Sequence, residues 1–134
     1  MTYKVFYVND LRECCYVVDC GSQKCVVIDP GMQNAGECGR IADYIRSKEL
    51  EPAAILLTHA HFDHIMGVNF ILRNWNIPVY MNQADERQAI SMPRNKLYFI
   101  NINIIINSNI FIYAIFCIMK CCSSNSASHN FNRL

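Results

Sequence analysis

The 134-residue sequence has no run of lysine or arginine, no Cys-x-x-Cys pair, and no apolar N-terminal stretch ending in a small-residue cleavage site. At a net charge of +1, the missing basic run argues against nucleic acid as a partner, because polyanions are bound by clustered cations. The missing secretory signal makes the cytoplasm the expected location. Without paired spacing, the eight cysteines are interpreted as reduced thiols packed as small hydrophobic groups.

The C-terminal third lacks four residue types altogether. From residue 94 onward there is no Gly, Pro, Asp or Glu, and Ile and Asn dominate residues 97–113. Because ordinary domains do not have this composition, we divide the chain into a domain-like part, residues 1–93, and an Ile/Asn-rich and then Ser/Asn-rich tail, residues 94–134. One hypothesis is that the tail is read from non-coding or frame-shifted sequence.

A membrane anchor is the functional alternative for the tail. Residues 97–119 are uncharged, and about 20 residues suffice to span a bilayer. However, four asparagines would each bury an amide in hydrocarbon, and the fully apolar residues 110–119 make only half a span. Membrane binding is therefore disfavoured, whereas exposed apolar, β-prone surface favours self-association.

The first 93 residues predict strands that alternate with helices. Runs rich in β-branched and aromatic residues, separated by Asn9-Asp10 and Gly21-Ser22, indicate an antiparallel meander that Pro30-Gly31 closes. Expected strands are residues 3–8, 15–19, 24–29, 53–57 and 79–81. Expected helices are a segment that ends near residue 49, residues 68–75, and residues 83–90 with Asn82 as N-cap. Such an α/β domain has a sheet that helices cover on at least one face.

Three histidines and an aspartate follow the apolar run 53–57. They lie in the segment Thr58-His59-Ala60-His61-Phe62-Asp63-His64. In an extended chain His59 and His61 project from the same side and can hold one cation, while Asp63 and His64 can offer oxygen and nitrogen to a second. This mixture of donors suits zinc, and also iron or manganese. The alternative is an exposed polar loop with no ligand role, which this density of donors disfavours.

This motif resembles that of the metallo-β-lactamase fold superfamily. The pattern His-x-His-x-Asp-His follows an apolar strand, with Val26-Val27-Ile28-Asp29-Pro30-Gly31 before it and Ile65-Met66-Gly67-Val68 after it. Within the superfamily it most resembles the small glyoxalase II-like hydrolases, which cleave thioesters such as hydroxyacylglutathione. The resemblance covers roughly residues 3–92. It implies the N-terminal half of an αββα sandwich, with a mixed sheet and covering helices.

The resemblance also implies roles for single residues. His59 and His61 would bind a first zinc ion, and Asp63 and His64 a second, with Asp63 counted as catalytic. Behind these ligands, Asp29 would orient the site by hydrogen bonding, and Thr58 would contribute a hydroxyl at most. Capping of the turn before Pro30-Gly31 is an independent interpretation of Asp29.

The implied activity is hydrolysis of a thioester or related acyl substrate by a metal-activated hydroxide. Family members take a third histidine, a bridging aspartate and a last histidine from the half that follows residue 92, and this sequence has none of them in context. His129 is interpreted as solvated, and Asp85 and Glu86 as surface residues. We therefore expect weak metal binding and poor turnover. Two alternatives stay open: an inactive truncated product, and a membrane-tethered metal-binding module without catalysis.

Overall fold

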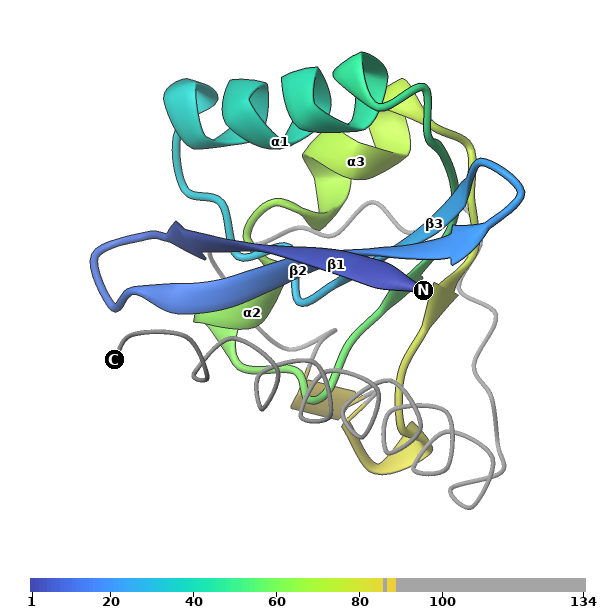
Figure 1. Cartoon of the computed structure of the whole chain (residues 1–134). Coiled ribbons are helices and arrows are strands. Elements are labelled where there is room, and N and C mark those ends of the chain that lie inside the picture. Colours follow the sequence, from blue (N-terminus) through green and yellow to red (C-terminus); the bar gives the residue numbers. More distant parts are fainter. Residues whose placement is uncertain (86, 89–134) are drawn as a thin grey trace, which may run out of the picture.

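The computed structural model describes residues 1–85, 87 and 88. Five strands form one sheet in the order β1-β2-β3-β4-β5, and helices α1 and α3 cover one of its faces (Figure 1). In chain order the elements are β1 (Thr2–Val8), β2 (Glu13–Gly21), β3 (Lys24–Ile28), α1 (Ala35–Ser47), β4 (Glu51–Leu56), α2 (Phe62–Ile65), α3 (Val68–Asn74), β5 (Val79–Tyr80) and the 3-10 turn η1 (Gln83–Asp85). The predicted α/β architecture is confirmed for this part of the chain.

The sheet is mixed. Strands β1, β2 and β3 pair antiparallel as the predicted meander, whereas β3 pairs with β4, and β4 with β5, in parallel. Parallel neighbours need crossover connections, which α1 provides between β3 and β4 and the segment with α2 and α3 provides between β4 and β5. The carboxyl ends of β3, β4 and β5 therefore meet at one edge.

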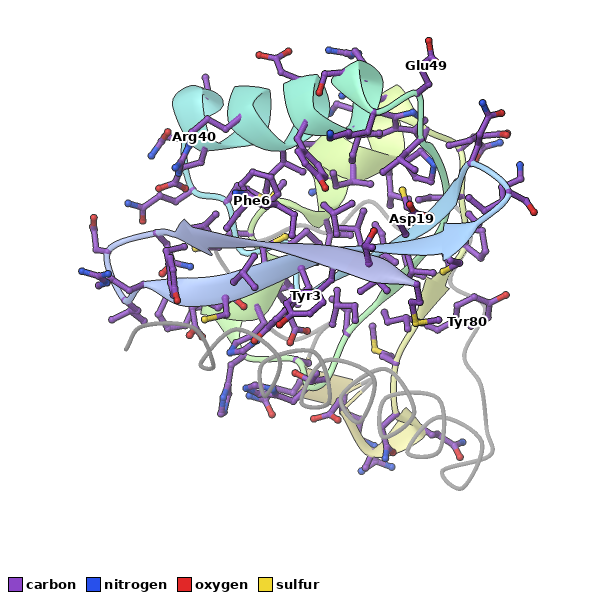
Figure 2. The ribbon with its side chains drawn as sticks, viewed as in Figure 1. Tyr3, Phe6, Asp19, Arg40, Glu49 and Tyr80 are labelled. Carbon is purple, nitrogen blue, oxygen red and sulfur yellow. The ribbon has the colours of Figure 1, made fainter. Side chains whose placement is uncertain are left out.

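Helix α1 packs its apolar stripe on the sheet. Its buried residues are Cys38, Ile41, Ala42 and Ile45, which recur at helical spacing. The helix begins after Asn34, whose side chain accepts a hydrogen bond from the backbone N–H of Glu37 at 3.0 Å. Phe6 projects from β1 toward this helix, on the side of the sheet opposite to Tyr3 (Figure 2). The centroid of its ring lies 5.5 Å from that of Tyr44.

One cluster of buried apolar side chains joins the sheet to its helices. It includes Val17, Val27 and Ile55 from the strands and Ile41, Ile45 and Ile71 from the helices. The five cysteines of the described part are all free thiols, and Cys15 and Cys25 are buried in this cluster. The interpretation as packed hydrophobic groups is confirmed for the buried Cys15, Cys25 and Cys38, whereas Cys14 is half-buried and Cys20 is exposed.

Several element boundaries differ from the prediction. Strand β2 begins at Glu13 rather than residue 15, and β4 begins at Glu51 rather than residue 53. Within β4, Ala53 is exposed. Of the helix expected over 83–90, residues 83–85 form a 3-10 turn and residues 87 and 88 are helical, while residues 86, 89 and 90 lie outside the described part. Asn82 accepts from Ala84 N–H at 2.9 Å, as expected of a cap. No helix among the described residues is long and apolar enough to cross a membrane, and residues 97–119 lie outside them.

Candidate metal centre

The histidine segment leaves the sheet where two parallel strands end side by side. Asp29 follows β3, and Thr58 lies just beyond β4. Backbone pairing continues past the strands, since the N–H of Asp29 donates to the carbonyl of Leu56 at 3.0 Å. Because the carboxyl ends of parallel strands form a common edge, polar residues that follow them converge there.

Asp29 and Thr58 are joined by two hydrogen bonds. The backbone N–H of Thr58 donates to Oδ1 of Asp29 at 2.8 Å, and the Thr58 hydroxyl donates to Oδ2 at 2.6 Å. Asp29 is only 4% exposed and has a positive φ of 47°. The N–H and side chain of Asp29 together join the end of β3 to the end of β4. Thr58 then contacts His59, and Asp29 contacts His64.

The Thr58 hydroxyl also determines which nitrogen of His59 is free. Its oxygen lies 2.9 Å from Nδ1 of His59. A hydroxyl has one proton, and Thr58 uses it to donate a hydrogen bond to Asp29. In the hydrogen bond between Thr58 and His59, Nδ1–H of His59 must therefore be the donor. The lone pair of His59 is thereby left on Nε2, the nitrogen available to a cation.

His59 is held in the neutral form that a metal requires. Burial lowers the pKa of His59, and the neighbouring His64 and His61 lower it further, against the weaker opposite effect of Asp29 and Asp63. A neutral imidazole keeps its lone pair at physiological pH. Protons therefore compete weakly with a cation for this side chain.

The three imidazoles lie together. The ring centroid of His59 is 4.5 Å from that of His61 and 4.0 Å from that of His64. His59 and His61 were expected to share one cation, and the structure also brings His64 against the ring of His59. His59 therefore contacts both of the other imidazoles of the motif.

A change of backbone conformation places the last two residues of the motif. His61 is extended, with φ −67° and ψ 147°, and the one-turn helix α2 follows it, which local spacing did not predict. The turn brings Oδ2 of Asp63 to 3.6 Å from Nε2 of His64. Phe62 points outward and is 49% exposed. Asp63 and His64 are thus neighbours in space with an oxygen and a nitrogen side by side.

Glu13 completes the inner wall of the site, and sequence reasoning missed it. Its side chain is almost fully buried, with Oε1 3.7 Å from Nδ1 of His64, and Asp29 Oδ2 lies 3.1 Å from the same nitrogen. Ligand atoms of these three residues lie within 4.8 Å of one another. In the described part, Glu13 Oε2 and His64 Nδ1 are buried without a hydrogen-bond partner.

A signal for Glu13 does exist in the sequence. Residues 13, 15 and 17 alternate on one face of β2, and all three are buried. A glutamate in phase with Cys15 and Val17 is a charged residue at a core position, which calls for a functional or structural partner. The predicted strand began too late to include it.

Burial raises the pKa of Glu13 to about 8, and the negative charges of Asp29 and Asp63 add to this effect. The backbone amides of Gly31 and Cys14 act in the opposite direction. A carboxyl with this pKa is mostly protonated at neutral pH in the absence of a cation. A positive ion among these carboxylates and imidazoles would relieve the repulsion. The donor set and its unpartnered buried atoms thus fit a divalent cation.

The fold is an α/β domain with a mixed sheet and helices on one face. A cluster of histidines and carboxylates, of the kind that binds metal ions, lies at the carboxyl edge of its parallel strands. Residues 10–97, more than half of the chain, match the sequence model of the Metallo-beta-lactamase superfamily. The chain belongs to this superfamily, whose members bind metal, and its sheet and helices correspond to part of that fold.

Similar proteins are found among curated sequences and solved structures. Over 63 residues the chain is 48% identical to "Probable metallo-hydrolase YqgX" of Bacillus subtilis, which covers 47% of this chain and 28% of that protein. Over 72 residues it is 40% identical to "Hydroxyacylglutathione hydrolase" of Bdellovibrio bacteriovorus, covering 54% and 27% respectively. The chain thus matches less than a third of the length of these two relatives.

Two solved structures share the fold at comparable identity. The BLEG-1 B3 metallo-beta-lactamase superposes with a TM-score of 0.60 at 31% identity, covering 69% of this chain and 42% of that one. TTHA1623 in a di-iron-bound form superposes with a TM-score of 0.54 at 34% identity, covering 63% and 40%.

Proposed function

We propose that this chain carries the histidine–aspartate part of the metal site of a hydrolase that acts on thioesters of the hydroxyacylglutathione type. The observation that carries the proposal is the contact of the His59 imidazole with those of His61 and His64, with His59 held neutral and its Nε2 left free. The names of the relatives support the substrate class, since one of them is a hydroxyacylglutathione hydrolase.

In this proposal His59 and His61 hold one cation, and Asp63 and His64 hold another. Zinc suits these donors, and iron or manganese are the alternatives. Such a cation, when bound, polarises an acyl carbonyl and lowers the pKa of a water molecule. Within the described residues each position has two donors, so we expect metal affinity to be modest.

The residues of the chain would act on substrate and water directly. The Asp63 carboxylate, beside His64 Nε2 at 3.6 Å, is placed to accept a hydrogen bond from the attacking water and orient it. Addition of that water to the thioester carbonyl and cleavage of the C–S bond yield a carboxylic acid and a thiol. Asp29 and Thr58 do not touch substrate, and they keep His59 in the tautomer that presents Nε2.

The test compares one motif histidine with a histidine outside the motif. Purified full-length chain, His61→Ala and the control His129→Ala are dialysed against zinc or iron and analysed for bound metal. We expect His61→Ala to lose at least about tenfold in metal affinity and His129→Ala to match the unsubstituted chain. Equal metal content in both variants, or no binding by the unsubstituted chain, would refute the metal site.

Hydrolysis of lactoylglutathione, followed by loss of the thioester absorbance, tests the reaction. Activity that depends on added metal and disappears in His61→Ala supports the proposed hydrolase. Metal binding without any turnover would instead favour the alternative of a binding module without catalysis.

A further inference from the structure

The turn between β1 and β2 reaches the histidine segment through the side chain of Asn9. The amide Nδ2 donates two hydrogen bonds, to the carbonyl oxygens of Gly31 and Asp63, each at 2.9 Å. Its Oδ1 accepts from the N–H of Leu11 at 3.0 Å. Both amide protons are therefore used to join two segments that are remote in sequence.

The backbone of Asn9 is held as firmly as its side chain. Asn9 has a positive φ of 50°, a conformation that Asn tolerates better than most residues. Its N–H donates to Oε1 of Glu37 at 3.0 Å, and the other oxygen of Glu37 accepts from Gln33 N–H at 2.8 Å. The first turn of α1 thus fixes the position from which Asn9 extends its amide.

Helix α2 depends on contacts of this kind, because a single helical turn is not stable by itself. On one side the Asp63 carbonyl accepts from Asn9, and on the other the N–H of Gly67 donates to the carbonyl of Pro30 at 2.7 Å. The turn that follows β3 lies so close that a Cβ at Gly31 would stand 1.8 Å from the Asp63 carbonyl oxygen. Small movements of this turn are therefore transmitted to α2.

We propose that Asn9 is a positioning residue, which sets the place of Asp63 and His64 by tying the backbone of α2 to the turn after β3. The inference rests on the proposed metal site, because its consequence is the geometry of that site. Asn9 contacts the backbone of Asp63 and not its carboxylate. Loss of the amide frees α2 to shift, and the two donors that it carries move away from the other histidines.

The informative variant is Asn9→Gly. Glycine adopts the positive φ freely and keeps the backbone N–H that donates to Glu37, so the substitution removes the side-chain amide alone. The control is Asn74→Ala, since the Asn74 amide is also hydrogen-bonded at both ends. It donates to the Phe70 carbonyl at 2.9 Å and accepts from Arg46 at 3.0 Å, at the end of α3. Each variant loses one side-chain amide, which makes three hydrogen bonds at Asn9 and two at Asn74.

Zinc affinity of the full-length chain, measured by competition with a chelator where all variants are folded, is the first readout. We expect Asn9→Gly to bind roughly 10-fold to 100-fold more weakly, as is typical when a partner behind the ligands is removed, and Asn74→Ala to bind as before. The second readout is amide hydrogen exchange at His64 and Gly67 in metal-free protein. In Asn9→Gly we expect exchange at these two amides to accelerate more than exchange of the amides in α1.

Each outcome decides the inference. Unchanged zinc affinity with unchanged exchange at α2, or equal acceleration throughout the molecule, would overturn the role of Asn9. If the unsubstituted chain binds no zinc, the proposed function fails, while the exchange measurement still decides whether Asn9 holds α2. If Asn9→Gly does not fold, the unsubstituted chain provides the test: zinc should shift the NMR signals of the Asn9 amide protons and leave those of Asn74 in place, and no shift would refute the inference.

Discussion

Replacing Thr58 by valine removes one hydroxyl and preserves the shape of the side chain. That hydroxyl donates to Asp29 Oδ2 at 2.6 Å and accepts from Nδ1–H of His59 at 2.9 Å. Two effects follow from the one change. The ends of β3 and β4 lose a bond, and His59 loses the acceptor that keeps its lone pair on Nε2.

The loss of stability can be estimated from the first bond. A hydrogen bond to a charged group contributes about 1.5–3 kcal/mol. Thr58 is exposed, and its N–H still donates to Asp29 at 2.8 Å, so water replaces part of the lost bond and the low end applies. We expect the free energy of unfolding to fall by about 1.5 kcal/mol, or roughly 6–12 °C in Tm for an ordered part of this size.

The effect on metal binding comes from the second bond. With no acceptor at Nδ1, His59 populates both neutral tautomers, and we expect zinc affinity to fall about tenfold or more. Thr58→Ser is the matched control, because serine keeps the hydroxyl and should retain most of both properties. Urea denaturation of metal-free protein measures the stability, and chelator competition measures the affinity. Equal zinc affinity in the valine and serine variants would refute the orientation of His59 by Thr58.

Two further substitutions test the inner wall of the site. The pKa of Glu13 is raised from 4.5 to about 8, so between these pH values the native state retains a proton that the unfolded state loses. The free energy of unfolding of metal-free protein should therefore decline as pH rises from about 4.5 to about 8, by at most about 1.4 kcal/mol per pH unit. Urea denaturation should show this decline disappear in Glu13→Gln. Identical pH profiles of stability for this variant and the unsubstituted chain would contradict the buried state of Glu13. Gly31→Ala places a Cβ against the Asp63 carbonyl and should cost about 1–3 kcal/mol with weaker zinc binding. Gly39→Ala, which has open space in α1, should be neutral or stabilising by about 0.5–1 kcal/mol, and thermal unfolding of the pair checks the contrast.

The alternation of strands and helices could be predicted because it depends on local periodicity. The meander of residues 3–29, the stripe of Ile41 and Ile45, and the apolar run after Pro52 each carry their own signal. Helix α2 could not be predicted in this way. Its four residues have no periodicity of their own, and they become helical because the turn after β3 and the side chain of Asn9 hold them from outside.

By itself the sequence determined which metal-type donors are neighbours and so predicted the kind of site, because the donor types of His59, His61, Asp63 and His64 need no folding to be recognised. Tertiary structure alone decided what surrounds them. Glu13 reaches His64 only through the pairing of β2 with β3, and Thr58 reaches Asp29 only because β3 and β4 end together. Spacing along a chain determines which donors can share a cation, whereas the tautomer, charge and position of those donors depend on long-range contacts between strands.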